Sequence, residues 1–297
     1  MAVAHDFKYY RPLYLKETLK LLADHTDKAR LLAGGTDLAV YIKEGMEHPE
    51  AVIDIKKIEE LQKLEIKTGS IFIGANVTFS ELLDNQKLKK DYLLLWESAR
   101  SVASVGIRNR ATLVGNICSA VPSMDSAPAL LCYDAVIYLQ SSKSSRQIPI
   151  SEWWLAPRKT AKRPDEIVVG VSINKPKVKH TGCYVKLGRY GGEDLAQAGL
   201  GLLINAQKVL KIAFCAVGPV PTRAHRIEKL LSGKALTSAL LEKAKALVPS
   251  EISPISDIRS GKEYRIHMCQ IMLERGINAC VDRLNGKKVD TLRILGG

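Results

Sequence analysis

Short apolar stretches rich in β-branched residues alternate with amphipathic segments along the first half of the chain. The stretches at residues 51–55 (AVIDI), 70–75 (SIFIGA) and 135–140 (AVIYLQ) have the length and composition of buried strands. At residues 14–25 and 91–104, apolar residues recur at steps of three and four, which predicts helices with one buried face. We therefore expect an α/β or α+β fold for this half.

The pattern changes near residue 174, which indicates a second folding unit. Residues 174–182 (NKPKVKHTG) are polar, contain proline and glycine, and lack periodicity, so we expect a domain boundary there. Three strand candidates follow at 182–190, 195–205 and 209–218, and the short polar connection at 206–208 predicts a hairpin between the last two. Helical periodicity then begins at 226, at 237 and near 263, where the predicted inward positions are Tyr264, His267, Ile271, Leu273 and Ile277. A small antiparallel sheet backed by helices is the simplest fold for this unit.

Length and composition are sufficient for a large buried core. The chain has 297 residues, of which 46% are hydrophobic, so it needs no disulfide framework to fold. Its six cysteines are widely separated, without a CxxC pair or a histidine-rich tract beside them, so we expect reduced thiols and no metal site. No charged-then-apolar leader opens the sequence, and no apolar run reaches the ~20 residues of a membrane span. These features predict a cytoplasmic protein that does not cross a membrane.

The formal net charge of +13 is compatible with an anionic partner. The 44 basic residues are nevertheless spread along the chain among 31 acidic ones, and aromatic residues make up only 6% of the sequence. A nucleic-acid-binding protein needs clustered charge and aromatic stacking platforms, and neither is visible. We therefore interpret the charge as solvated surface and expect no nucleic-acid partner.

Two adjacent glycines, Gly34 and Gly35, lie between an apolar stretch at 29–33 and a predicted helix at 38–45. Thr36 or Asp37 is a candidate N-cap for that helix. A strand, a glycine turn and a capped helix form a loop whose backbone N–H groups can bind phosphate, because no Cβ stands in the way. An ordinary strand-to-helix turn has the same composition, so this signal alone leaves both interpretations open. The spacing is neither GxGxxG nor GxxxxGK[ST].

A second segment, residues 107–130 (IRNRATLVGNICSAVPSMDSAPAL), concentrates small polar side chains. Their spacing is too irregular for one helix or one strand, which predicts a loop rich in hydrogen-bonding groups. A plain surface loop would carry more charge. The six histidines are isolated from one another, so we assign no catalytic acid, base or nucleophile.

Several ordered motifs resemble the FAD-binding (medium) subunit of the molybdenum hydroxylases, the family of xanthine dehydrogenase and carbon monoxide dehydrogenase. They are AGGTDL at 33–38, IGANVTFSEL at 73–82, the segment at 107–131, YVKLGRYGGEDLAQAG at 184–199 and AVGPVPTRAHRIEKLLSG at 216–233. The resemblance extends over nearly the whole chain, and the length suits a free-standing medium subunit. It implies an α+β fold with a p-cresol methylhydroxylase-type FAD-binding domain of two α/β subdomains at residues 1–176. A smaller α+β domain with an antiparallel sheet and helices follows at 181–290.

The resemblance also implies FAD-binding positions. The first loop faces the pyrophosphate, the second grips the same phosphates, and Ser119 and Asp125 hold the phosphate and ribitol parts. A backbone contact near the flavin falls on Ile167 or Val168, and Lys186 lies beside the ring system. The matching positions are Leu31, Leu32, Ala33, Gly34, Gly35, Thr36, Asp37, Leu38, Thr112, Gly115, Asn116, Ser119, Asp125, Ile167 and Lys186.

One position departs from the family pattern. Val114 stands where the second loop usually has the first glycine of GGN. A branched side chain disfavours a positive φ angle, so we expect either an extended backbone at Val114 or a slightly different approach of the loop to FAD.

By resemblance, the chain is an electron-transfer subunit that passes electrons from a partner [2Fe–2S] subunit through FAD to NAD⁺ or another acceptor. The implied partners are a molybdopterin-binding large subunit and the [2Fe–2S] small subunit, in a dimer of heterotrimers. One alternative is a self-contained FAD-dependent oxidoreductase of the same fold, for which no substrate-facing acid or base is visible. A basic nucleic-acid-binding or scaffolding protein is a second alternative, but it leaves the two loops without a purpose.

Overall fold

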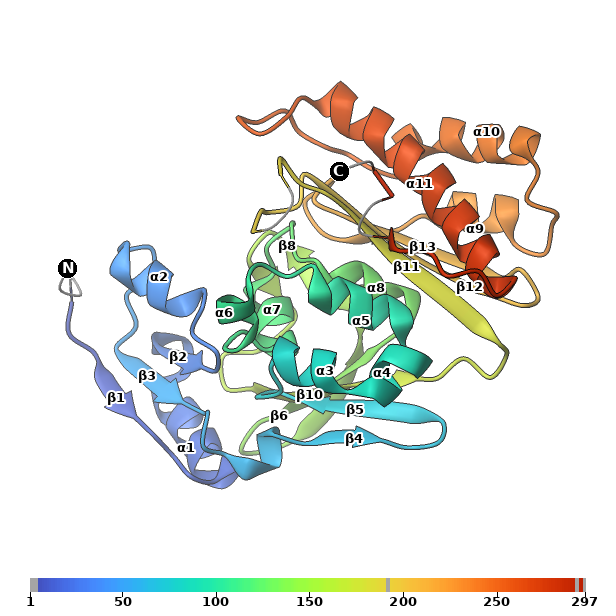
Figure 1. The fold of residues 1–297 in the computed structure, drawn as a ribbon. Helices are drawn as coiled ribbons and strands as arrows, with labels where there is room; N and C mark the ends of the chain where they lie inside the picture. Colours follow the sequence, from blue (N-terminus) through green and yellow to red (C-terminus); the bar gives the residue numbers. More distant parts are fainter. Residues whose placement is uncertain (1–4, 191–192, 292–293, 296–297) are drawn as a thin grey trace.

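The computed structural model describes residues 5–190, 193–291 and 294–295. Three layered units follow one another along the chain (Figure 1). The first is a small parallel sheet with two helices, the second a larger sheet with its own helices, and the third an antiparallel sheet covered by the last helices. The first two units share one continuous apolar core, and a second core lies around the third sheet.

The first unit is a three-stranded parallel sheet in the order β1-β3-β2. The central strand β3 is buried at all four residues, the three apolar ones and Asp54, as expected for a strand covered on both faces. The elements are β1 (Lys8–Tyr10), α1 (Leu15–His25), β2 (Ala29–Leu32), α2 (Leu38–Lys43) and β3 (Ala51–Asp54).

The second unit is a five-stranded sheet in the order β4-β5-β10-β6-β7, with every pairing antiparallel. Its strands are β4 (Leu64–Ile66), β5 (Ser70–Gly74), β6 (Val136–Gln140), β7 (Ser145–Pro149) and β10 (Ile167–Asn174), with a separate hairpin of β8 (Trp154–Ala156) and β9 (Lys159–Thr160). Its helices are α3 (Phe79–Asp84), α4 (Gln86–Asp91), α5 (Leu93–Arg100), α6 (Val105–Arg108), α7 (Leu113–Ser119) and α8 (Ser126–Cys132).

Short 3₁₀ turns occur in all three units. They are η1 (Thr26–Lys28), η2 (Glu59–Leu61), η3 (Ile150–Glu152) and η4 (Val248–Ser250).

The third unit is an antiparallel sheet in the order β11-β12-β13-β14. The hairpin predicted at 206–208 is confirmed, because it connects the antiparallel pair β12 and β13. The strands are β11 (His180–Leu187), β12 (Ala198–Asn205), β13 (Leu210–Cys215) and β14 (Thr222–Arg223), and the helices are α9 (His225–Leu231), α10 (Ser238–Leu247) and α11 (Lys262–Leu284).

Strand β12 is buried on both faces, which explains its apolar sequence without polar alternation. Helix α11 covers one face of the sheet, and α5 and α8 of the second unit cover the other (Figure 1). A Cβ added to Gly201 would lie 2.8 Å from Cβ of Pro128 in α8, so glycine is needed for the close contact between strand and helix. The sequence predicted the helices on one face only; the docking of the second unit on the other is a tertiary feature.

The inward face of α11 differs from the predicted one. Leu273 and Ile277 are buried as predicted, whereas Tyr264 and His267 are exposed. The buried residue of the first turn is instead Arg265, which is only 2% exposed and forms an ion pair of 2.6 Å with Asp257. Periodicity alone placed the stripe wrongly because it cannot foresee that a paired arginine occupies a core position.

Within the described residues, none of the helices combines the length and the apolar character needed to cross a bilayer.

Replacing Gly201 by valine is expected to lower the free energy of unfolding by about 2 kcal/mol, because the new side chain must displace α8 from the sheet. Urea unfolding followed by tryptophan fluorescence measures the change. The control is Gly69→Val, since nothing lies within 4 Å of a Cβ at Gly69. Equal stability of the two variants would contradict close packing between the units.

Candidate functional site

A pocket of about 900 Å³ opens where the three units meet. The first unit contributes the connection between β2 and α2, and the second contributes α7 and the loop that follows it. Residues 189–190 and 193–195 of the third unit and Arg259 complete the wall. The size lies within the range of cofactor and ligand pockets in proteins.

The structure brings most of the predicted site residues to this pocket. Its lining includes Leu31, Ala33, Gly34, Gly35, Thr36, Asp37, Leu38, Thr112, Gly115, Asn116, Ser119, Asp125 and Ile167. Two predicted residues, Leu32 and Lys186, are not part of the lining. Leu32 instead packs beneath the glycine turn, where its Cδ1 would lie 3.0 Å from a Cβ at Gly35. The ammonium group of Lys186 donates to the carboxylate of Asp125 and to the carbonyl oxygen of Ser101.

The turn between β2 and α2, which lines the pocket, contains unused backbone donors. In the described part of the chain, the N–H groups of Gly34, Gly35 and Thr36 meet no hydrogen-bond acceptor. Gly35 has a φ angle of +79°, which an L side chain rarely adopts. Consecutive N–H groups in such a turn bind an anion well.

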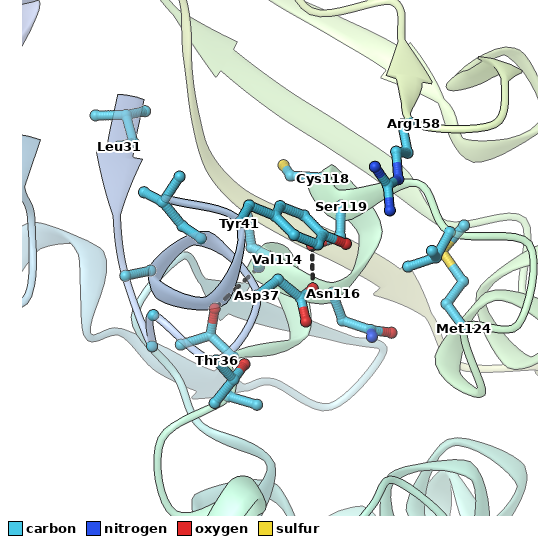
Figure 2. A pocket seen from close by; sticks show the side chains of 18 of the residues that line it. Leu31, Thr36, Asp37, Tyr41, Val114, Asn116, Cys118, Ser119, Met124 and Arg158 are labelled. Atoms are coloured by element: carbon cyan, nitrogen blue, oxygen red, sulfur yellow. Dashed lines mark hydrogen bonds between the residues drawn. The ribbon is translucent and has the colours of Figure 1, made fainter. Parts of the chain in front are cut away.

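The carboxylate of Asp37 has a role other than the predicted one. Asp37 does occupy the N-cap position of α2, but its side chain makes no capping hydrogen bond. It accepts a hydrogen bond from the hydroxyl of Ser119 in α7 (Figure 2). Asp37 and Ser119 therefore tie the first loop to the second across the pocket floor.

Gly34 is required by a contact inside the protein. A Cβ at this position would overlap the carbonyl oxygen of Arg110, which precedes the second loop. The two loops thus touch through their backbones. The glycine pair is explained by the close approach of the second loop at Gly34 and by the positive φ at Gly35.

The segment at 107–130 is mostly helical, so the prediction of a loop was wrong. It contains the end of α6, all of α7 and the start of α8, and the irregular polar pattern arises because short helices and turns alternate. Thr112 is the N-cap of α7 and accepts a hydrogen bond of 2.9 Å from the N–H of Gly115. Val114 lies in the first turn of α7 and is buried, so its branched side chain imposes no strain and the expected extended backbone is not found.

Helix α7 is held firmly on its far side. The indole N–H groups of Trp153 and Trp154 both donate to the carbonyl oxygen of Ile117, at 3.0 and 3.1 Å. The side-chain oxygen of Asn116 accepts from the hydroxyl of Ser126 at 2.6 Å, which leaves the amide nitrogen as a donor. The pocket wall formed by α7 is therefore fixed in position before any ligand binds.

The third unit reaches the site through Asp125. Lys186 of β11 donates to Oδ2 of Asp125 at 2.9 Å and to the carbonyl oxygen of Ser101 at 2.9 Å. Tyr184, on the same strand, donates to Oδ1 of Asp125 at 2.7 Å. Burial raises the pKa of Asp125, while Lys186 and the Tyr184 hydroxyl oppose that rise.

The pocket lining also contains residues that sequence reasoning missed, among them Tyr41, Cys118, Arg158 and Lys162. The guanidinium of Arg158 lies 4.7 Å from the centre of the Tyr41 ring (Figure 2). Burial raises the pKa of the Cys118 thiol to about 12, so this cysteine is a poor nucleophile at neutral pH. Nothing in the local sequence marks these residues, because they reach the pocket from α2, α7 and the β8–β9 region only after folding.

This arrangement is suited to binding an elongated anionic molecule. Free backbone N–H groups, the hydroxyls of Thr36 and Ser123 and the Asn116 amide supply neutral donors for a pyrophosphate. Apolar residues, among them Ile107 and Met124, line other parts of the pocket and suit planar rings. Among the described residues, no group of His, Cys, Asp and Glu is arranged to hold a metal ion. The donor set fits FAD, a dinucleotide with a pyrophosphate between two ring systems.

Comparisons with known proteins agree with this chemistry. The family model described as "FAD binding domain in molybdopterin dehydrogenase" matches residues 5–176, and "CO dehydrogenase flavoprotein C-terminal domain" matches residues 183–280. The xanthine dehydrogenase FAD-binding subunit of Escherichia coli O157:H7 is 31% identical over 95% of this chain and 99% of its own length. The caffeine dehydrogenase subunit beta of a Pseudomonas species is 28% identical over 94% and 96%.

A solved structure matches as well. A chain of the carbon monoxide dehydrogenase from Hydrogenophaga pseudoflava superposes with a TM-score of 0.91 and 28% identity, over 95% of this chain and 99% of that one. Fold and pocket define a two-part α+β flavoprotein, which confirms the predicted fold class. The chain belongs to the family of FAD-binding subunits of the molybdenum hydroxylases. It is an oxidoreductase component whose cofactor is FAD.

The two glycines give a graded stability test. Gly34→Ala is expected to cost about 2 kcal/mol of unfolding free energy, because Arg110 must move away. Gly35→Ala is expected to cost about 1 kcal/mol through its positive φ angle. Gly69→Ala, in open space, is the control and is expected to change stability by less than about 0.5 kcal/mol. Denaturant unfolding of the FAD-free protein gives the order, and a Gly34 variant as stable as the control would exclude the backbone contact.

Proposed function

We propose that this chain is the electron-transfer subunit of a xanthine dehydrogenase-like molybdenum hydroxylase. It receives electrons from a partner [2Fe–2S] subunit and delivers them to NAD⁺ or another acceptor. A molybdopterin-binding large subunit completes the complex, which we expect to be a cytoplasmic dimer of heterotrimers. The observation that carries the proposal is the row of unpartnered N–H groups at residues 34–36, in the lining of a pocket where the three units meet in a chain of this family.

We assign FAD to the pocket with the pyrophosphate at the two loops. The N–H groups of Gly34, Gly35 and Thr36 bind it from one side, and residues 112–116 bind it from the other. Ser119 orients the first loop through Asp37, and Asp125 offers a carboxylate to the hydroxyl-rich part of the cofactor. Ile167 and residues 189–190 and 193–195 enclose the rings. The FAD-binding domain comprises residues 1–176 in this proposal, and the smaller domain residues 181–290.

The chain's own contribution is binding and orientation. When bound, FAD supplies the redox chemistry, since it accepts electrons singly and passes on a hydride. The protein neutralises the pyrophosphate with oriented dipoles, so binding requires little rearrangement. The raised pKa of the Cys118 thiol keeps this side chain protonated, so it does not act as a nucleophile toward the cofactor. Burial lowers the pKa of the Lys162 ammonium group. This division of work explains why the pocket has many donors but no recognisable acid–base pair.

Reconstitution tests the cofactor assignment. The purified chain, refolded with FAD, is expected to bind one flavin per chain, with flavin absorbance in the visible range and FAD identified by mass spectrometry. FMN is expected to bind at least about tenfold more weakly, because it lacks the adenosine and the pyrophosphate that we assign to the first loop. A protein that stays colourless, or that binds both equally, would contradict the assignment.

Complex formation tests the proposed partners. A tagged chain expressed in its native host is expected to retain proteins that contain molybdenum and iron, detected by elemental analysis. The isolated chain alone is expected to show no hydroxylase activity. Substrate turnover by the isolated chain would favour the self-contained oxidoreductase instead.

A further inference from the structure

The carboxylate of Asp125 is held from two directions by a single strand of the other domain. Asp125 precedes α8, lines the pocket and is only 7% exposed. Tyr184 and Lys186 stand two positions apart on β11, so both side chains leave the same face of the sheet. The tyrosine hydroxyl donates to Oδ1 and the lysine ammonium to Oδ2, at 2.7 and 2.9 Å. Both carboxylate oxygens thus have a donor from the third unit.

Tyr184 itself is held both at its backbone N–H group and at its side-chain hydroxyl group. Its backbone N–H donates to the carboxylate of Glu97 in α5 at 3.0 Å, and Arg283 of α11 pairs with the same carboxylate. Its side chain is almost completely buried, and its ring carries the hydroxyl to Asp125. The position of the hydroxyl therefore follows the docking of the two domains.

The groups that face Asp125 make its charge sensitive to this hydroxyl. They are Lys186 and Tyr184 of β11, with the Cys215 thiol of β13 beyond, 3.6 Å from the tyrosine oxygen. Burial raises the pKa values of Tyr184 and Cys215 well above their usual range, so both stay protonated near neutral pH. Lys186 is the only cation bonded to the carboxylate within the described chain, and it shares its donors with Ser101. Without the phenol, one oxygen of a buried carboxylate loses its donor.

We propose that Tyr184 is a positioning residue of the FAD site, which keeps Asp125 ionised and directed into the pocket through the bond between their side chains. The inference rests on the proposed FAD site and deepens it. The third unit, through Tyr184, then influences the affinity of the pocket for FAD. An ionised and fixed carboxylate accepts strong hydrogen bonds from a ligand at both oxygens, whereas a protonated one is a weaker acceptor and a rotated one is directed elsewhere.

The test variant is Tyr184→Phe, which removes the hydroxyl and keeps the ring. FAD affinity of the apo chain, measured by quenching of flavin fluorescence, is expected to fall about tenfold at pH 7. Loss of the tyrosine donor raises the pKa of Asp125 further, so the fall in FAD affinity on acidification begins at a higher pH in the variant. The matched control is Tyr92→Phe, because the Tyr92 hydroxyl is also buried but has no hydrogen-bond partner in the described chain. The control is expected to bind FAD like the wild type.

A double-mutant cycle separates positioning from general destabilisation. In an Asp125→Asn background, the carboxamide carries no charge to maintain, so Tyr184→Phe is expected to lower FAD affinity by less than about twofold. An equal loss in both backgrounds, or no loss in the wild-type background, would overturn the role of Tyr184. If the Tyr184→Phe variant does not fold, the Asp125→Asn variant alone tests the inference. An FAD affinity and a pH dependence of that affinity equal to those of the wild type would then overturn it. Failure of the wild-type chain to bind FAD at all would instead contradict the proposed function.

Discussion

The backbone contact between Gly34 and Arg110 is the constraint on which the site depends. Two segments about 75 positions apart in sequence approach so closely that no side chain fits between them. The Asp37–Ser119 hydrogen bond fixes the same two segments a few residues further on. Because the loops are held to each other, the turn that carries the unpaired N–H groups is fixed in the pocket lining without a ligand.

The site handles negative charge with dipoles more than with cations. The cations near the pocket have partners of their own: Arg30 pairs with Glu47, Lys162 donates to backbone carbonyl oxygens, and Arg158 stacks on Tyr41. Neutral donors held by a rigid frame can offset the desolvation of a pyrophosphate with little reorganisation of the protein. The formal charge of +13 therefore belongs mainly to the surface, as its even distribution in the sequence indicates.

The third unit is part of the site as well as an added domain. Its central strand is buried between α11 and the helices of the second unit, which fixes β11 against the pocket. From there it holds Asp125 through Tyr184 and Lys186. The same strand therefore takes part in the docking of the third unit on the second and holds a carboxylate of the pocket lining.

The sequence by itself determined many of the strands and helices, and the family. The runs AVIDI and SIFIGA became β3 and β5, because short stretches rich in β-branched residues are favourable as strands with at least one buried face. The loop motifs identified the flavoprotein family, and most of the residues that they singled out lie in the pocket lining, because these motifs are short-range patterns.

Only the tertiary structure decided the rest. It showed that Gly34 is required by Arg110, that Arg265 occupies a core position of α11, and that Tyr41, Arg158 and Tyr184 join the site. These facts depend on contacts between residues far apart in the chain, and local periodicity carries no information about which distant backbone, ion-pair partner or hydroxyl group will meet a given residue.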